Sequence, residues 1–209
     1  MLQALKVEWM KIKNYRTFWV LLAITVVSIP AFNYMLYNII TSNTPSGAQM
    51  LLGSPFAFPN VWQTVSWNAS LLFIIPALLI ITLTTNEFTF KTHRQNIIDG
   101  WNRGQFVSVK LLGVLLLSIV CTLTMTLTAV GFGCVGKTAA TAIFTQQDSR
   151  FIFFYFVQIL SYSFIAYLLS MLIKRAGLAI GAFLIYMILE QVAVGIGAHK
   201  YNVKWVETR

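Results

Sequence analysis

The chain has 209 residues, of which 57% are hydrophobic and 10% are charged. A soluble domain carries roughly 25% charged residues because its surface must be solvated, so this composition excludes an ordinary soluble fold. It also excludes a disordered chain, which needs low hydrophobicity. The net charge of +9 does not indicate nucleic-acid binding, because the basic residues are scattered between apolar runs instead of lining one surface. We therefore expect an integral membrane protein that binds no nucleic acid.

The first sixteen residues are predicted to form a helix that lies in the membrane interface. Apolar residues such as Leu5 and Met10 are interleaved with charged ones, which is the pattern of an amphipathic helix and not of a spanning one. The alternative is a charged flank that only sets topology. The residues assigned to this interfacial helix are Glu8, Trp9, Lys11, Lys13 and Arg16.

Five segments are apolar over about 20 residues, the length that a helix needs to cross the hydrocarbon core. They are residues 17–37, 67–85, 109–131, 151–173 and 176–195. Their apolar runs do not alternate as the strands of a membrane β-barrel do. The fold class predicted is an all-α membrane protein, in which residues 1–209 form one transmembrane domain, a bundle of five helices.

Four threonines in the third predicted span recur with a period of two, which is typical of a strand. They are Thr122, Thr124, Thr126 and Thr128. In a helix, each hydroxyl can bond the backbone carbonyl one turn back. Because a long apolar run precedes them, we predict a helix here too.

Orientation follows from the basic residues near the ends of the spans. If the N-terminus is cytoplasmic, the segments on that side carry twice as many Lys and Arg residues as the outer segments. Residues 38–66 are uncharged and are expected to pack on the outer face, to dip back into the membrane, or to form an ordinary capping loop. Five spans place the C-terminal tail outside, as a short outer segment or because a sixth span is missing from this sequence.

Residues 131–138 fit the phosphate-loop pattern G-x-x-x-x-G-K-[ST] letter for letter. Nucleotide binding by that pattern requires a buried strand before the loop and a helix after it. Here a predicted membrane span stands before it, so the match is interpreted as accidental. No catalytic residue and no metal site are expected in this chain.

Glu190 is an acid well inside the last predicted span. A charge at such a depth is costly unless it faces protein or water. Two interpretations stay open. Glu190 belongs to a translocation surface, or it lies near the outer interface or in its neutral form.

The most polar stretch is residues 87–110, on the predicted cytoplasmic side. Thr92 and Gln95 have the spacing of a reciprocal helix cap, and Gly100 is a plausible stop. The short helix between them would present Ile97, Ile98 and the nearby Trp101 as apolar anchors, which suits insertion into a groove of a partner protein. The alternative is a solvated turn whose basic residues only fix topology.

This stretch resembles the membrane subunits of type-2 ABC exporters. The positions that carry the resemblance are Glu87, Thr92, Arg94, Arg103, Phe106 and Lys110. The N-terminal segment is similar to the interfacial helix of that family, and the layout is similar over nearly the whole chain. Two features depart from the family pattern: residues 100–102 replace the proline usual before the arginine, and the family usually has six spans.

The resemblance implies a permease subunit of the bacterial inner membrane that couples a separate ABC ATPase dimer to export of an amphipathic peptide, lipid or drug. ATP and magnesium would bind that partner, no cofactor would bind this chain, and a second permease copy or a related permease would complete the unit. The ATPase-coupling residues would be Glu87, Thr92, Arg94, Ile97, Ile98, Trp101, Arg103 and Lys110. Alternatives are a non-transporting anchor or assembly protein that docks a cytosolic partner, and a membrane enzyme built around His93.

Overall fold

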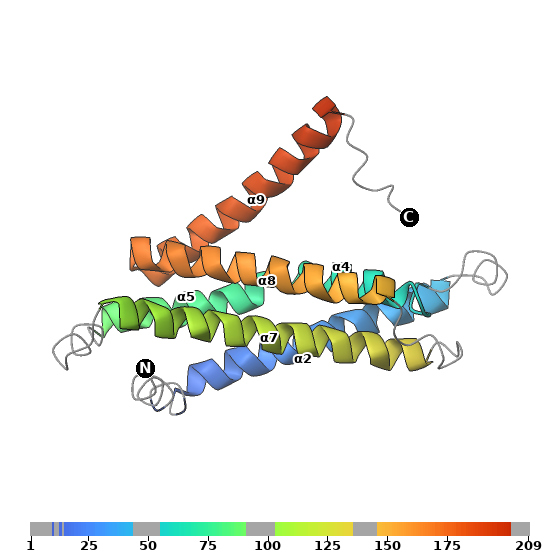
Figure 1. Ribbon diagram of the computed structural model, residues 1–209, viewed down its shortest axis with the longest axis horizontal. Coiled ribbons are helices and arrows are strands. Elements are labelled where there is room, and N and C mark those ends of the chain that lie inside the picture. Colours follow the sequence, from blue (N-terminus) through green and yellow to red (C-terminus); the bar gives the residue numbers. More distant parts are fainter. Residues whose placement is uncertain are drawn as a thin grey trace.

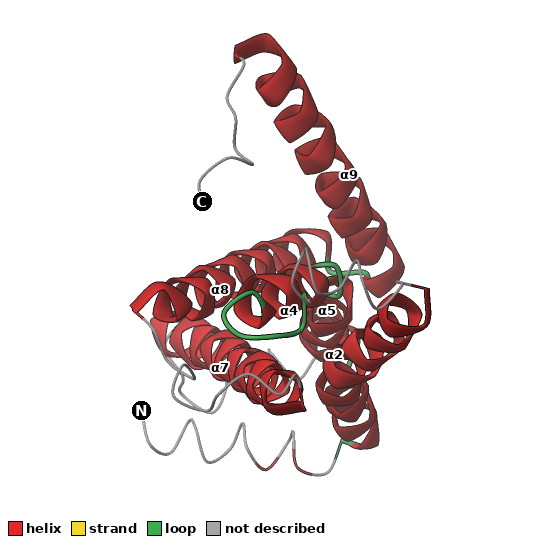
Figure 2. Cartoon of the chain, turned by 90° about the vertical axis from the view of Figure 1, so that its right-hand side faces the viewer, coloured by secondary structure: helices red, strands yellow, loops and turns green. Residues whose placement is uncertain are grey.

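The computed structural model describes residues 15–43, 55–90, 103–135 and 146–201, together with Met10 and Lys13. Within these ranges the chain forms six helices and no strand (Figures 1 and 2). The helices are α2 (Arg16–Asn43), α4 (Val61–Ser70), α5 (Ile74–Thr89), α7 (Arg103–Val135), α8 (Gln146–Ile173) and α9 (Ala176–Tyr201). The prediction of an all-α fold is confirmed.

Four of these helices, α2, α7, α8 and α9, are long and apolar enough to cross a membrane, and α4 with α5 would make a fifth, bent span. The helices extend beyond the predicted spans by up to six residues. For example, α2 ends at Asn43, whereas the predicted first span ended at residue 37. The boundary between the last two helices lies at Lys174 and Arg175, between the predicted spans 151–173 and 176–195. The chain is a multi-pass membrane protein.

The threonines of α7 make the bonds expected of helical residues in lipid. Each of the four donates its hydroxyl to the carbonyl four residues earlier, at 2.7–2.8 Å. Thr122 thus donates to Ser118, and Thr126 donates to Thr122. Because these hydroxyls are satisfied within the helix, they can lie in an apolar span without a partner elsewhere.

The second span differs from the single helix predicted over residues 67–85. It begins earlier, at Val61, and α4 and α5 meet at an angle of 41° with residues 71–73 between them. Pro76 has no N–H to donate to the carbonyl of Leu72, and that carbonyl accepts instead from the N–H of Ile75, at 3.0 Å. A proline therefore causes the bend, and shorter-range bonds satisfy the backbone there.

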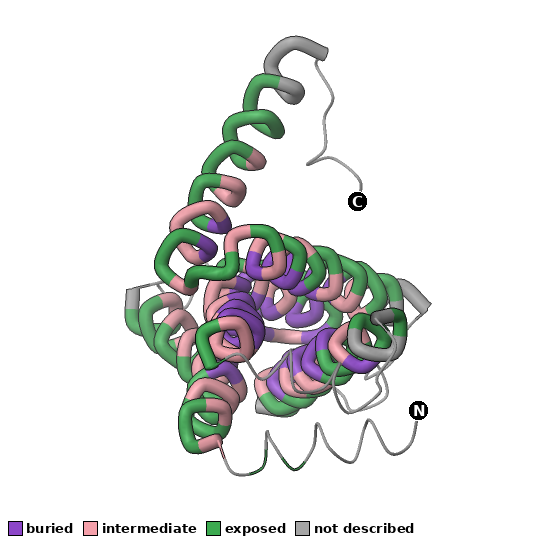
Figure 3. Tube along the Cα trace, turned by 90° about the vertical axis from the view of Figure 1, so that its left-hand side faces the viewer, coloured by how far each residue is buried: buried purple, intermediate pink, exposed green. Residues whose placement is uncertain are grey.

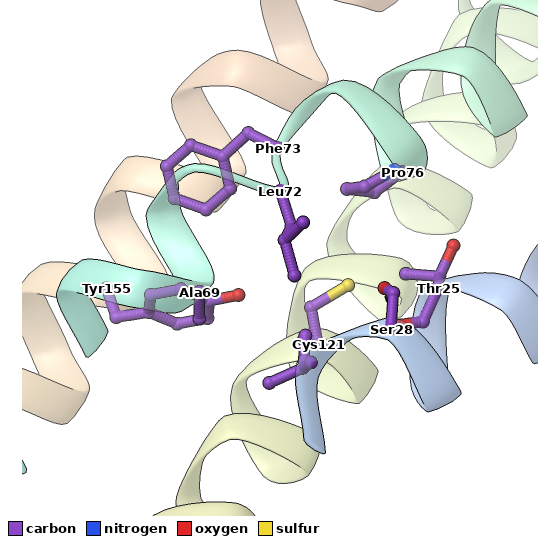
Figure 4. Close-up of a pocket in the computed structure, with 9 residues that line it drawn as sticks. Thr25, Ser28, Ala69, Leu72, Phe73, Pro76, Cys121 and Tyr155 are labelled. Atoms are coloured by element: carbon purple, nitrogen blue, oxygen red, sulfur yellow. Dashed lines mark hydrogen bonds between the residues drawn. The ribbon is translucent and has the colours of Figure 1, made fainter. Parts of the chain in front are cut away.

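The side chains around this bend are closely packed (Figure 4). Thr25 and Ser28 of α2, Leu72 at the bend and Cys121 of α7 surround a point that has no space for a water molecule. On the other side, the ring of Phe73 lies 4.9 Å from that of Tyr162 on α8. Packing from three helices fixes the bend in place.

Helix α4 lies at the centre of the bundle and contacts α2, α7 and α8. Its residues Val61, Trp62 and Val65 are fully buried. The segment before it is buried as well: Phe56 and Phe58 are 2% and 6% exposed. For its described part, the connection between the first two spans therefore dips back among the helices.

Helix α9 begins against the bundle and then projects away from it (Figures 1 and 3). It contacts α8 and α5, and its buried side chains, Ala179 and Phe183, lie in its first part. Farther along, apolar residues such as Ile188 and Val192 are more than half exposed. This outer part of α9 is suited to contact with lipid or with another membrane helix.

Candidate functional site

The end of α5 is joined to the start of α7 by an ion pair. The ammonium of Lys110 donates to Oε1 of Glu87, and the two side chains are 12% and 13% exposed. Both residues also line a groove that includes Tyr167 of α8. Because an ionised group at this depth is costly without a counter-charge, the two side chains stabilise each other.

The residues on either side of Glu87 link α5 to two further elements. The amide of Asn86 donates to the hydroxyl of Tyr15, just before α2, at 2.5 Å. The ring of Phe88 lies 5.8 Å from Nζ of Lys174, in the turn between α8 and α9, which is a cation–π distance. Three consecutive residues of α5 therefore contact three different parts of the bundle.

The turn at Lys174 has an unusual backbone. Its φ of 56° lies in the left-handed region, which at the end of a helix is normally occupied by glycine. The N–H of Lys174 donates to the carbonyl of Ser170 at 3.0 Å, which closes α8 before α9 begins. This conformation allows α9 to begin immediately after the turn, and it places the ammonium of Lys174 over the ring of Phe88.

These contacts gather at one end of the bundle, which we call the Glu87 end. It consists of the start of α2, the last turn of α5, the start of α7 and the turn at residues 174–175. At the opposite end, the rings of Tyr37, Phe56 and Phe132 form a cluster with centroids 5.4–5.7 Å apart. The Glu87 end therefore carries an ion pair and several basic residues, whereas the opposite end contains an aromatic cluster.

The structure brings together two of the predicted coupling residues, Glu87 and Lys110, and places Arg103 at the first position of α7. Of the predicted interfacial residues, Arg16 begins α2, and Lys13 accepts a 3.0 Å bond at its carbonyl from the indole of Trp19. The remaining predicted residues lie outside the described ranges: Glu8, Trp9, Lys11, Thr92, Arg94, Ile97, Ile98 and Trp101. The short helix predicted after Thr92, with His93, lies outside them too.

Glu190 on α9 pairs with Tyr162 on α8. The hydroxyl of Tyr162 donates to Oε2 of Glu190 at 2.6 Å. The ring of Tyr162 also packs against Phe183 and Tyr186 of α9, with centroids 6.4 Å and 6.3 Å away. Glu190 thus faces protein, as an acid in a span must, and the bond holds α9 to α8 where the two helices diverge.

A profile of known sequences, described as ABC-2 family transporter protein, matches residues 4–190. The chain belongs to the ABC-2 transporter family. It is therefore the permease, the membrane-spanning subunit, of an ABC transporter. Comparison with curated proteins and with solved structures found no match.

The phosphate-loop pattern of this ABC-2 permease begins inside a membrane helix. Gly131, Gly133 and Cys134 are helical residues of α7, which continues to Val135. A phosphate-binding loop follows a strand and precedes a helix, whereas these glycines stand within a helix. Gly133 has a packing role instead, because a side chain there would overlap the ring of Phe58. The rest of the pattern lies outside the described residues.

Several residues that shape the site of the permease were not singled out from the sequence. Tyr15, Asn86 and Phe88 lie next to predicted spans, and Tyr162 lies within one. A polar or aromatic residue at the end of a span gives no sign of its partner. Asn33 and Asn68 were missed too, although an amide inside an apolar run is itself a signal of a buried polar contact.

Proposed function

We propose that this permease works in an ATP-driven exporter of the bacterial inner membrane, with its Glu87 end facing the cytoplasm. A separate ABC ATPase dimer would bind ATP and magnesium and dock at this end, and a second permease copy or a related one would complete the unit. The cargo would be an amphipathic peptide, lipid or drug. Among the described residues of the spans, the acids are Glu87 at the end of α5, which is paired with Lys110, and Glu190, which does not favour an ion pathway.

One observation carries this proposal: the last turn of α5 is tied to three other elements immediately before residues 91–102. Tyr15, Lys110 and Lys174 each contact one residue of this turn. Movement of the segment after the turn would be passed to α2, α7 and the turn between α8 and α9 together. Rotation of packed helices about their interfaces is a common way to switch a membrane protein between two states.

The charges support the orientation. The basic side chains described at the Glu87 end are Lys13, Arg16, Lys110, Lys174 and Arg175. At the opposite end, the one described basic side chain is Arg150. An excess of Lys and Arg marks the cytoplasmic side of bacterial membrane proteins.

The coupling role is tested with Ile97→Asp and Ile98→Asp in the permease co-purified with its ATPase. We expect normal membrane insertion and loss of permease-stimulated ATP hydrolysis, because a charge replaces the apolar anchors predicted for the docking helix. Asn38→Asp is the matched control, since it adds the same charge to an exposed position on α2 far from the Glu87 end. Unchanged ATP hydrolysis in both isoleucine variants would overturn the coupling assignment. A complex without substrate-dependent ATP turnover would favour the anchor or assembly role.

The orientation is tested with single cysteines at exposed basic positions near opposite ends of α8. Arg175→Cys and Arg150→Cys are each made in a variant whose native cysteines, Cys121 and Cys134, are alanine. A membrane-impermeant maleimide should label Arg150→Cys in intact cells and Arg175→Cys only in inside-out vesicles. The reverse pattern would place the N-terminus outside.

A further inference from the structure

A groove of about 610 Å³ lies between α2, α5 and α7 and opens at the Glu87 end. Its walls are apolar and include Leu22 of α2, Leu83 of α5 and Leu117 of α7. Its polar residues lie at one end and include Asn86 and Lys110. In Figure 1, α2 and α7 cross near the middle and separate toward the end where α2 begins. The groove therefore has an apolar interior and a polar mouth.

The space in the groove is left open by a glycine. Gly113 of α7 lines the groove, and a Cβ added there would meet no atom within 4 Å. Glycine in a helix costs about 1 kcal/mol relative to alanine, so helix formation does not favour it. Apolar walls that face empty space also lose their dispersion contacts. An apolar occupant would restore these contacts.

The length of the groove corresponds to one leaflet of a bilayer. Along α7 it runs from Val109 to Val120, which is about 16 Å at the rise of an α-helix. That is close to half of the hydrocarbon core of about 30 Å. A single acyl chain of a lipid, with its headgroup at the level of Lys110, has this length.

The mouth of the groove can recognise a lipid headgroup. Tyr15 and Trp19 line it, and the exposed basic residues Lys13 and Arg16 adjoin them.

We propose that this groove binds one acyl chain of an anionic phospholipid, whose phosphate lies at the basic mouth. Basic pockets between membrane helices on the cytoplasmic side are suited to anionic headgroups. Lys110 is neutralised by Glu87, so the preference for negative charge comes mainly from Lys13 and Arg16. The site requires only that the chain spans a membrane, and it does not depend on the coupling role proposed above.

The test uses the purified permease in nanodiscs with phosphatidylglycerol that carries a photoreactive diazirine in the middle of an acyl chain. Labelled residues are identified by mass spectrometry of peptides. We expect label on groove residues such as Leu22 and Val120. Phosphatidylcholine with the same acyl chain should label these residues more weakly. In the double variant Lys13→Gln with Arg16→Gln, the preference for phosphatidylglycerol over phosphatidylcholine should fall by about fivefold for each charge removed.

Gly113→Trp should fill the groove and abolish most of the labelling. Gly131→Trp is the matched control, because Gly131 is on the same helix and a Cβ added there also meets no atom within 4 Å. Gly113→Leu serves as a smaller filler should the tryptophan variant fail to fold. Unchanged labelling in a folded groove-filling variant, or equal labelling by the two lipids, would overturn the proposal.

The same preparation distinguishes another occupant, the N-terminal segment of the chain itself. A photoreactive amino acid in place of Leu116, a groove residue that is 53% exposed, should cross-link to lipid. A cross-link to residues 1–14 instead would show that the groove holds this segment, and the lipid assignment would be wrong.

Discussion

Glu87 and Lys110 form an ion pair across the junction of α5 and α7, and both side chains are almost nine-tenths buried. They are 23 positions apart in the sequence, on either side of the segment predicted to meet the ATPase. A buried pair of this kind is costly to break, because the remaining buried charge loses the attraction of its counter-charge. The pair therefore fixes the spacing of two helix ends next to the proposed docking segment.

Replacing either partner should destabilise the permease. We expect Glu87→Gln and Lys110→Met each to cost about 3 kcal/mol, since each removes the attraction between two buried opposite charges. Thermal unfolding in detergent measures this loss. The exchanged pair, Glu87→Lys with Lys110→Glu, should recover most of it, and Arg150→Met, at an exposed position, should have little effect. An exchanged pair no more stable than the single variants would show that the attraction between the two charges is unimportant.

Gly133 of α7 should tolerate no side chain. A Cβ at this position would overlap the ring of Phe58, which is 6% exposed, so Gly133→Ala should cost about 1–3 kcal/mol through overpacking. Gly131→Ala, two residues earlier and without a neighbour within 4 Å, should instead be neutral or stabilise the helix by up to about 1 kcal/mol.

This prediction is tested by measuring the thermal unfolding midpoints of Gly133→Ala and Gly131→Ala in the same detergent. Phe58→Leu should partly rescue Gly133→Ala, because the smaller side chain vacates the space that the new methyl group needs. Equal midpoints for Gly133→Ala and Gly131→Ala would contradict the close contact between α7 and the segment before α4.

How much of this structure could be predicted from the sequence depends on whether a feature is local. The helical state of Thr122 and its neighbours was predictable, because the apolar run and the bonds to the preceding turn belong to one segment. The boundary at Lys174 and Arg175 was marked by charge. Pro30 lies inside the continuous helix α2, whereas the chain bends by 41° just before Pro76, so the presence of a proline in a membrane helix does not by itself show whether the helix breaks there.

Of the residues that meet at the Glu87 end, Glu87 and Lys110 were named from the resemblance to type-2 ABC exporters, but their contact with each other was not predicted. The bond from Asn86 to Tyr15 joins residues that are 71 positions apart, and no local pattern carries that information. Glu190 was recognised as an acid in a span, whereas its partner Tyr162, 28 positions earlier, resembled any other aromatic residue of an apolar run.

The bond from Tyr162 to Glu190 should hold α9 to α8. Tyr162→Phe keeps the ring contacts and removes the hydroxyl that donates at 2.6 Å, so we expect a loss of about 1 kcal/mol. Tyr34→Phe is the control, since Tyr34 is 60% exposed. In a double-mutant cycle with Glu190→Leu, the coupling energy should be about 0.6 kcal/mol and at most about 1.7 kcal/mol, the mean and the maximum found for hydrogen bonds between membrane helices.

A spectroscopic distance measurement gives a second readout of this bond. Spin labels on α8 and on the outer part of α9, at Val157→Cys and Val192→Cys, occupy exposed positions. Tyr162→Phe should broaden the distribution of distances between them, because α9 diverges from the bundle beyond the bond. An unchanged distribution would mean that the ring contacts alone set the angle of α9.

The last prediction concerns two amides buried together in the apolar bundle. Asn68 of α4 donates to Oδ1 of Asn33 on α2 at 3.0 Å, and Asn33 donates to the carbonyl of Ile29 at 2.9 Å. Removal of one partner leaves a buried polar atom unsatisfied, whereas replacement of both by apolar groups of similar size is nearly neutral. We therefore expect Asn68→Leu to cost about 1–2 kcal/mol, and Asn33→Leu with Asn68→Leu to cost less than that single change. The free energies of unfolding in detergent show which of the two variants is the more stable. A double variant less stable than Asn68→Leu would show that α2 contributes the shape of Asn33, and not its hydrogen bond, to the contact with α4.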